Sequence, residues 1–158
     1  MIRVSSLRRQ RGIGMIEVLI AVLVVSIGFL GMAALQAKAL STNNSAMARS
    51  MATVATYSIL DAMRADLVNA KAGNYSHTVT ASDCASASGG NALATTQLQA
   101  WCTELGNTLG AVSTTTGKVD CTVVGDCTVT IQFDDSRAGK AGTTGDTGTQ
   151  TVVTEAGL

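Results

Sequence analysis

Residues 11–35 have the sequence RGIGMIEVLIAVLVVSIGFLGMAAL, and this stretch decides the architecture of the rest of the chain. Between Ile13 and Leu35 the one ionisable residue is Glu17. A run of this length is sufficient to cross a bilayer core, which needs about 20 mostly apolar residues. Four arginines and no acidic residue precede the run. This charge pattern predicts a single-pass membrane helix whose N-terminus stays on the cytoplasmic side.

Glu17 is unusual because a carboxylate within an apolar run is costly to place in a membrane. One interpretation is that the carboxylate reaches the membrane interface at the start of a helix, where the macrodipole favours a negative charge. The other is that Glu17 meets a charged partner within the apolar region. Taken alone, the residue leaves both interpretations open.

The residues before the apolar run resemble the type IV prepilin signal, also called the class III signal. A short basic leader ends at Gly12, and Glu17 follows five residues later. The resemblance implies that a prepilin peptidase cleaves between Gly12 and Ile13 and methylates the new N-terminus. The leader is then residues 1–12, and the apolar segment is retained. An ordinary secretory signal is instead cleaved after its apolar region.

The apolar run is most similar to the PilV branch of the minor pilins, through its ending SIGFLGMAALQ at residues 26–36. Two positions depart from the family, because Ile13 stands where many pilins have Phe and Gly14 where Thr or Ser is frequent. The resemblance implies a non-enzymatic minor pilin that joins other minor and major pilins in a priming complex near the filament tip. It also implies that Glu17 pairs with the N-terminal amine of a neighbouring subunit.

The same resemblance implies where the chain is found. A pilus assembly platform would extract it from the inner membrane, where its head lies in the periplasm, and deliver it to the pilus fibre at the cell surface. Two alternatives remain open. A minor pseudopilin of a type II secretion system would share the leader, Glu17 and the helix, whereas a bitopic periplasmic protein unrelated to pili would not be cleaved at Gly12.

Composition limits the classes of function. Without residues 1–12 the chain keeps seven Lys and Arg against eleven Asp and Glu, a net charge of −4, and no basic patch suited to nucleic acid. Sequence motifs for a serine nucleophile, a phosphate-binding loop or a zinc peptidase are absent from the chain. His77 is the single histidine and is expected in a solvated loop. We therefore expect no catalytic residue and no cofactor.

Four cysteines follow the long helix: Cys84, Cys102, Cys121 and Cys127. An even number in a small exported domain indicates disulfides, and the absence of a CxxC pair disfavours zinc. Three pairings are possible. Alternation along two predicted strands places Cys121 and Cys127 on either side of one turn, which favours a bond between them and leaves Cys84 to pair with Cys102.

Helical periodicity without Gly or Pro extends the apolar run into one continuous helix from Ile13 to Lys71, within a helical region 13–72 whose membrane segment is about 13–35. Its second half is expected to pack on the head. The stripe predicted to face the core consists of Leu40, Met47, Met51, Val54, Tyr57, Leu60, Met63 and Leu67.

Residues 73–158 are predicted to form a small disulfide-stabilised head. A polar connector at 73–91 contains a short extended segment at 77–80. Asn91 then caps a short helix that holds Trp101 in the core and ends at Gly106.

The remaining segments alternate like strands, around 119–123, 129–133 and 149–155, with a turn at Gly125-Asp126. The predicted fold is therefore α+β, with a long N-terminal helix packed on a small head of one short helix and an antiparallel sheet. Asp134, Asp135 and Asp146 lie in the last loop, but their spacing lacks the EF-hand pattern. We expect a solvated turn there and no metal site.

Overall fold

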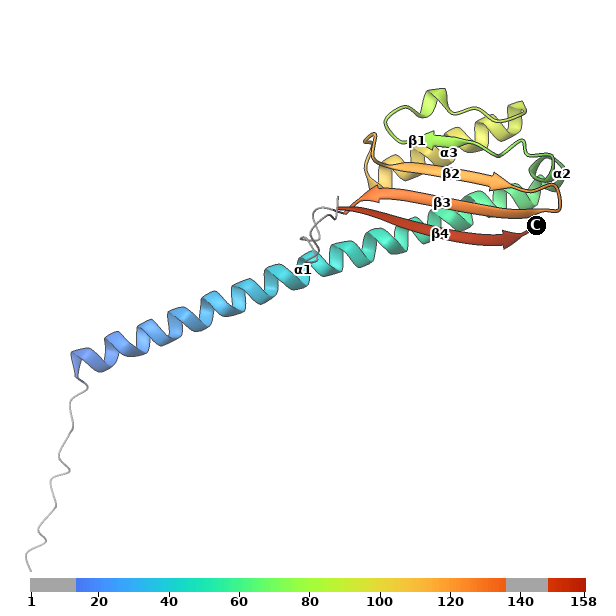
Figure 1. Ribbon diagram of the computed structural model, residues 1–158. Helices are drawn as coiled ribbons and strands as arrows, with labels where there is room; N and C mark the ends of the chain where they lie inside the picture. The colour runs from blue at the N-terminus through green and yellow to red at the C-terminus, as the bar shows by residue number, and fades with distance from the viewer. Residues whose placement is uncertain (1–13, 136–147) are drawn as a thin grey trace, which may run out of the picture. The chain divides into compact units, whose positions relative to one another are not determined.

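The computed structural model describes residues 14–135 and 148–158. A long N-terminal helix is followed by a small head with a helix and a four-stranded antiparallel sheet, which confirms the predicted α+β fold (Figure 1). The chain divides into two units between Ala39 and Leu40. The elements are α1 (Met15–Ala65), α2 (Leu67–Lys71), β1 (Thr78–Thr80), a 3-10 turn (Cys84–Ser86), α3 (Ala92–Leu109), β2 (Thr116–Cys121), β3 (Asp126–Asp134) and β4 (Thr149–Gly157).

The first unit contains the apolar part of α1. Every residue from Gly14 to Ala39 is exposed. The hydroxyl of Ser26 donates to the Val22 carbonyl at 2.7 Å, so this polar group is satisfied inside the helix. By length and composition α1 is suited to crossing a membrane. An apolar surface that its own chain leaves uncovered fits a membrane segment or a helix that packs against other subunits.

The predicted continuous helix is interrupted at Asp66, between α1 and α2. Asp66 has φ −127° and ψ 51°, outside the helical region. Its carboxylate accepts hydrogen bonds from Tyr75 Oη at 3.1 Å and from Asn69 Nδ2 at 2.7 Å. These contacts accompany the loss of regular helix geometry at one residue. Because neither Gly nor Pro is involved, the sequence does not indicate this break.

The break belongs to a polar cluster formed by Asp66, Asn69, Asn74 and Tyr75, here called the Asp66 cluster. Asn74 Nδ2 donates to Asn69 Oδ1 at 2.8 Å, which connects the break to the loop after α2. Tyr75 is fully buried. Its burial, followed by the hydrogen bond to Asp66 and the negative charge of that residue, raises the pKa of Tyr75 to about 12. Each cause favours the neutral phenol over the phenolate.

The sheet is a meander in which the order β1-β2-β3-β4 follows the chain, with antiparallel neighbours throughout. β3 alternates as predicted, with its buried side chains being Cys127, Val129, Ile131 and Phe133. The strands predicted near 119–123 and 149–155 are present, but β2 ends at Cys121. Val123 therefore lies in the turn between β2 and β3, where it is 89% exposed. Gly125 has φ +101°, which explains why this turn needs a glycine.

Helix α3 begins as predicted but is longer than expected. Asn91 Oδ1 accepts a hydrogen bond from the Ala94 N–H at 2.8 Å, which confirms the cap. The predicted end at Gly106 is wrong, because the helix continues to its C-cap at Gly110, where φ is +110°. Glycine inside a helix costs only about 1 kcal/mol. The additional turn packs Leu109 against the core, which offsets this cost.

Trp101 of α3 is a core residue, as predicted, and is 2% exposed. Its Nε1–H donates to the Ala55 carbonyl of α1 at 2.8 Å, so α3 is joined to the head part of α1 through a buried hydrogen bond. On its other side the indole faces Gly117 of β2, where a Cβ atom would lie 2.4 Å from Trp101 Cη2. The indole can approach α1 and β2 this closely because the facing residues, Ala55 and Gly117, are small.

The head part of α1 turns a different face to the core than predicted. Leu60 and Met63 are buried as expected, but the other buried positions are Ala52, Ala55, Thr56 and Ile59. Most of the predicted stripe is exposed, namely Leu40, Met47, Val54, Tyr57 and Leu67, whereas Met51 is half-buried. The prediction was wrong because it relied on the spacing of large apolar residues, whereas α1 contacts Trp101 through the small residue Ala55. The exposed part of this stripe defines an uncovered apolar face in the head.

Candidate functional site: the start of the long helix

The predicted cleavage position, Gly12 and Ile13, lies outside the described residues. Gly14 lies directly before α1. The Gly14 carbonyl accepts hydrogen bonds from the N–H groups of Glu17 at 2.9 Å and Val18 at 3.4 Å. The helix therefore starts within a few residues of the predicted cleavage position, and Glu17 lies in its first turn.

Glu17 is exposed, and within residues 14–135 and 148–158 it forms no ion pair. A carboxylate in the first helical turn is stabilised by the unsatisfied N–H groups of that turn. This placement suits a group that stays near a membrane interface. It equally suits a group that receives a positive charge from another chain, so the geometry of the single chain is compatible with both interpretations.

Small residues in the apolar part of α1 leave room for another helix. A Cβ atom placed on Gly28 or Gly31 would meet nothing within 4 Å. Glycine lets two helices approach closely in an apolar environment. No described residue of the chain fills this space, which is therefore available to lipid or to a second helix.

The disulfides join Cys84 to Cys102 and Cys121 to Cys127, the pairing that strand alternation favours. Cys121 and Cys127 face each other across β2 and β3, with a Cα–Cα distance of 4.1 Å. The neighbouring bond from the Thr122 N–H to the Asp126 carbonyl shows that the cysteine pair occupies a non-hydrogen-bonded position, where opposing side chains lie closest. The bond closes the hairpin at the base of its turn.

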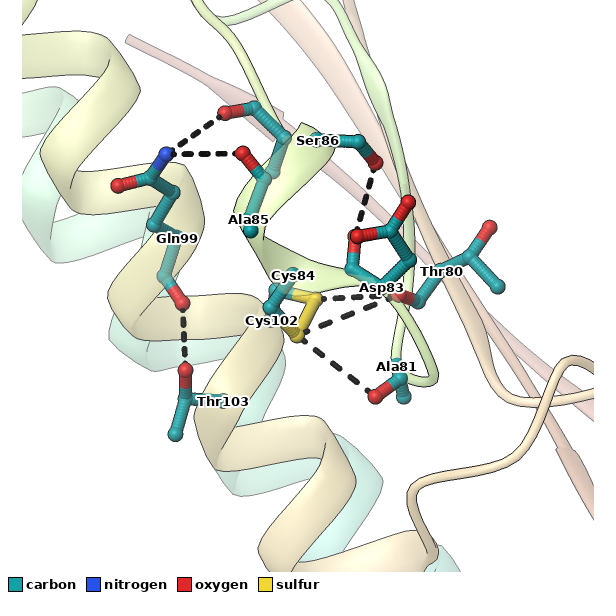
Figure 2. The surroundings of a disulfide bond; sticks show 10 residues. Thr80, Ala81, Asp83, Cys84, Ala85, Ser86, Gln99, Cys102 and Thr103 are labelled. Carbon is teal, nitrogen blue, oxygen red and sulfur yellow. Dashed lines mark hydrogen bonds between the residues drawn. A yellow bond between two sulfur atoms is a disulfide. The ribbon is translucent and has the colours of Figure 1, made fainter.

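The second disulfide ties the 3-10 turn after β1 to α3 (Figure 2). Gln99 reinforces this connection by donating from Nε2 to the Ala85 carbonyl at 3.4 Å and to the Ala87 carbonyl at 3.2 Å. Thr80 O lies 3.4 Å from Cys102 Sγ. A disulfide sulfur carries no proton, so we regard this approach as a contact and not a hydrogen bond.

The acidic residues near the β3–β4 connection do not form a metal site in the described part of the chain. Asp146 lies outside the described residues. The Asp135 carboxylate accepts a hydrogen bond from Ser45 Oγ of α1. Within the described ranges, no group of three or more His, Cys, Asp or Glu side chains is arranged to hold a metal ion. His77 is half-buried, and its carbonyl accepts from the Val119 N–H at 2.9 Å.

The outer face of the sheet has a shallow polar depression of about 690 Å³. Acidic side chains dominate its charge, and its lysine, Lys118, pairs with Asp120 at 3.0 Å. The depression contains no histidine and no unpaired cysteine. The sequence does not indicate this surface, because it forms from outward residues of β2, β3 and β4 whose registers the sequence does not specify.

The exposed apolar tip of the turn between β2 and β3 was also not predicted from the sequence. Val123 and Val124 are 89% and 77% exposed, at a tip held by the disulfide below it. Gly125 N–H donates to the Thr122 carbonyl at 3.0 Å, so the turn is internally bonded. The VVGD sequence combines a strand-forming pair with a turn signal, and only the latter determines the local structure here.

Residues 7–33 match the family model described as the prokaryotic N-terminal methylation motif. No protein of curated function and no solved structure shows significant similarity to the chain. The motif supports a pilin-type or pseudopilin-type protein that a prepilin peptidase processes and that assembles into pilus-like fibres. Together with the apolar part of α1, it fits a membrane-anchored pilin.

Proposed function

We propose that this chain is a minor pilin of a type IV pilus, of the PilV type, and that it acts with other minor pilins in a complex that primes fibre assembly near the tip. It is not an enzyme and needs no cofactor. The methylation motif at residues 7–33 is the observation that carries the proposal. The uncovered apolar helix and the small disulfide-bonded head support it, because a fibre subunit needs a packing helix and a stable exposed domain.

In this function the leader is cut after Gly12, and the new amine of Ile13 is methylated. The chain stays anchored in the inner membrane, with its head in the periplasm, until the assembly platform extracts it. Glu17 then accepts the positive charge of a neighbouring subunit's N-terminal amine. A charge–charge contact in an apolar environment is strong only when both groups are desolvated together, so the pair favours one helix register over others.

Replacing Glu17 tests this role directly. The Glu17→Val chain should still be cleaved and inserted into the membrane, because the change removes a charge from an apolar run. It should enter fibres poorly, since a neighbour's amine is left without a partner. Glu17→Asp is the matched control that keeps the charge, and Gly12→Ala should block cleavage.

The measurement combines mass spectrometry of the N-terminus with the amount of the chain in sheared fibres. We expect a mature chain that begins at Ile13 with one added methyl group. A chain that keeps Met1 in cells with an active prepilin peptidase would contradict the pilin function. Normal incorporation of Glu17→Val would leave Glu17 as an interfacial group and remove the pairing role.

The second candidate is a minor pseudopilin of a type II secretion system, because the matched motif supports both classes. Deletion of the gene distinguishes them. Loss of surface pili and twitching favours the minor pilin, whereas loss of exoprotein secretion favours the pseudopilin.

A further inference from the structure

The two edge strands of the sheet, β1 and β4, differ in how far they are protected from pairing with a strand of another chain. β1 spans three residues, and its end is closed by a turn in which the Asp83 N–H donates to the Thr80 carbonyl at 2.9 Å. β4 spans nine residues and forms the opposite edge (Figure 1). It contains no Pro and no Lys. Natural sheets usually shorten, charge or cover their edges, and Glu155 is the one charged residue that β4 itself carries, so an edge of this length can accept a partner strand.

Hydrogen bonds at the two ends of β4 show which backbone groups face outward. Asp135 N–H donates to the Gly148 carbonyl at 2.6 Å, and Leu158 N–H donates to the Gly125 carbonyl at 2.9 Å. Hydrogen-bonded pairs alternate along an antiparallel ladder. The register between these ends therefore directs the backbone groups of even-numbered β4 residues toward β3. The N–H and C=O groups that point out of the sheet include those of Thr151, Val153 and Glu155.

The direction of β4 limits what can bind there. Arg49 of α1 donates to Gln150 Oε1 near the start of β4 at 2.7 Å. At the other end, Leu158 and Lys71 both lie next to Gly125. β4 and the head part of α1 therefore run the same way. Two copies paired β4 to β4 as antiparallel strands would direct the head parts of their α1 helices oppositely, which does not suit heads that share one orientation along a fibre.

Copies whose heads lie side by side in one orientation would instead bring β4 against β1. Those strands are antiparallel, because the sheet has four alternating strands. β1 is only three residues long and ends in a hydrogen-bonded turn, so it cannot pair with the whole of Thr151–Glu155. Neither arrangement of identical copies covers this edge, which favours a segment of a different subunit as the occupant.

Side chains near the edge define the chemistry of that segment. Glu155 lies with Asp120 and Asp126 along the outer depression, and Lys118 is already paired with Asp120. Val153 is 57% exposed. A basic side chain opposite Glu155 and an apolar one opposite Val153 would complement this edge, since cross-strand pairs of these kinds stabilise a sheet.

We propose that the β4 edge at Thr151–Glu155 binds an extended segment of a different fibre subunit as a fifth, antiparallel strand. The proposal rests on the proposed function, which supplies the fibre. Main-chain bonds would provide affinity, and the side chains opposite Val153 and Glu155 would provide selectivity.

Val153→Pro tests the edge without breaking the bonds between β3 and β4, because the N–H that it removes points outward. Val153→Thr keeps that N–H and is the matched control. In cells that assemble fibres, both full-length variants should be cleaved after Gly12 and form both disulfides. The amount of Val153→Pro in sheared fibres should fall about tenfold, as expected for losing one interfacial hydrogen bond and leaving its acceptor unpaired. Val153→Thr keeps the N–H and loses only part of the apolar contact, so it should lower incorporation less than Val153→Pro.

Glu155→Lys provides a second variant that does not alter the backbone. It should lower incorporation by opposing the basic side chain of the partner, whereas Glu155→Gln should have a smaller effect. A photo-crosslinking side chain at Thr151 should join an extended segment of another fibre subunit, and Val153→Pro should abolish this adduct.

The outcomes separate the two proposals. Normal incorporation of both Val153→Pro and Glu155→Lys, or a crosslink to a second copy of this chain, overturns the edge proposal and leaves the fibre function intact. A native chain that is uncleaved or absent from fibres overturns the fibre function, and the edge proposal falls with it.

Discussion

Replacing Gly117 by alanine should destabilise the head, because β2 has no space for a methyl group under the indole of Trp101. The new Cβ would lie 2.4 Å from Trp101 Cη2 and 2.7 Å from Leu105 Cδ1. Ordinary contact begins near 3.4 Å, so the indole or the strand must move by about 1 Å. Both neighbouring side chains are buried, which leaves little free volume for that movement.

Overpacking of this kind costs about 1–3 kcal/mol. Moving the indole also strains its 2.8 Å hydrogen bond to the Ala55 carbonyl, whose loss costs about 1 kcal/mol more. We expect the free energy of unfolding to fall by about 2–4 kcal/mol, a large part of the roughly 5–15 kcal/mol of a typical domain. The melting temperature of the head should fall by about 10 °C.

The assay is thermal unfolding of the full chain in detergent, followed by circular dichroism. Gly157→Ala is the matched control, because its Cβ would meet only Asp126 Oδ1, at 3.9 Å, and should change stability by less than about 0.5 kcal/mol. In a Trp101→Phe background, which removes part of the obstructing ring, Gly117→Ala should cost at least about 1 kcal/mol less. Equal costs in the two backgrounds, or a Gly117→Ala change as mild as the control, would refute the packing argument.

Two further predictions concern the disulfides and the Asp66 cluster. Replacing Cys84 and Cys102 by serine should destabilise the head by about 3 kcal/mol, and replacing Cys121 and Cys127 by about 2 kcal/mol. The two bonds span 18 and 6 residues, and a crosslink that closes a longer loop lowers the entropy of the unfolded chain more. Denaturant unfolding of the two double variants checks this order, and the reverse order would contradict it. Because folding raises the pKa of Tyr75 from 10.0 to about 12, its neutral phenol stabilises the fold. This stabilisation is fully present below pH 10 and is lost as the pH rises to about 12. Tyr75→Phe should remove that loss in stability measured across this interval, and an unchanged pH profile would refute the assignment.

The sequence predicted the elements well where periodicity and composition dominate. β3 alternates strictly between buried and outward residues, so its identification as a half-buried strand followed from Val129, Ile131 and Phe133. The cap at Asn91 and the core position of Trp101 likewise depend on local chemistry and on helical spacing. Such features need no knowledge of what lies across the core.

The errors arise where tertiary contacts decide the structure. The helix break at Asp66 coincides with hydrogen bonds to Asn69 and to Tyr75, which lies nine residues further along the chain. The face of α1 was wrong because Ala55 meets Trp101, 46 residues away, and small residues contribute little to an apolar pattern. Glu17 was singled out by sequence, yet its partner cannot be found in one chain, because the proposed pair forms only between subunits.

The order of the sheet has a consequence for how the head folds. β2 and β3 pair across a short turn that the Cys121–Cys127 disulfide closes, so this hairpin needs only local loop closure, whereas β1 joins β2 across the whole of α3. Hairpins form in about 1–10 μs, whereas disulfide formation takes seconds or longer. The contacts of greater sequence separation join α1 to the rest, through Ala55 with Trp101 and Ser45 with Asp135. We therefore expect the β2–β3 hairpin to form as an early kinetic unit, with oxidation, the addition of β1 and the docking of α1 as the later, slower events.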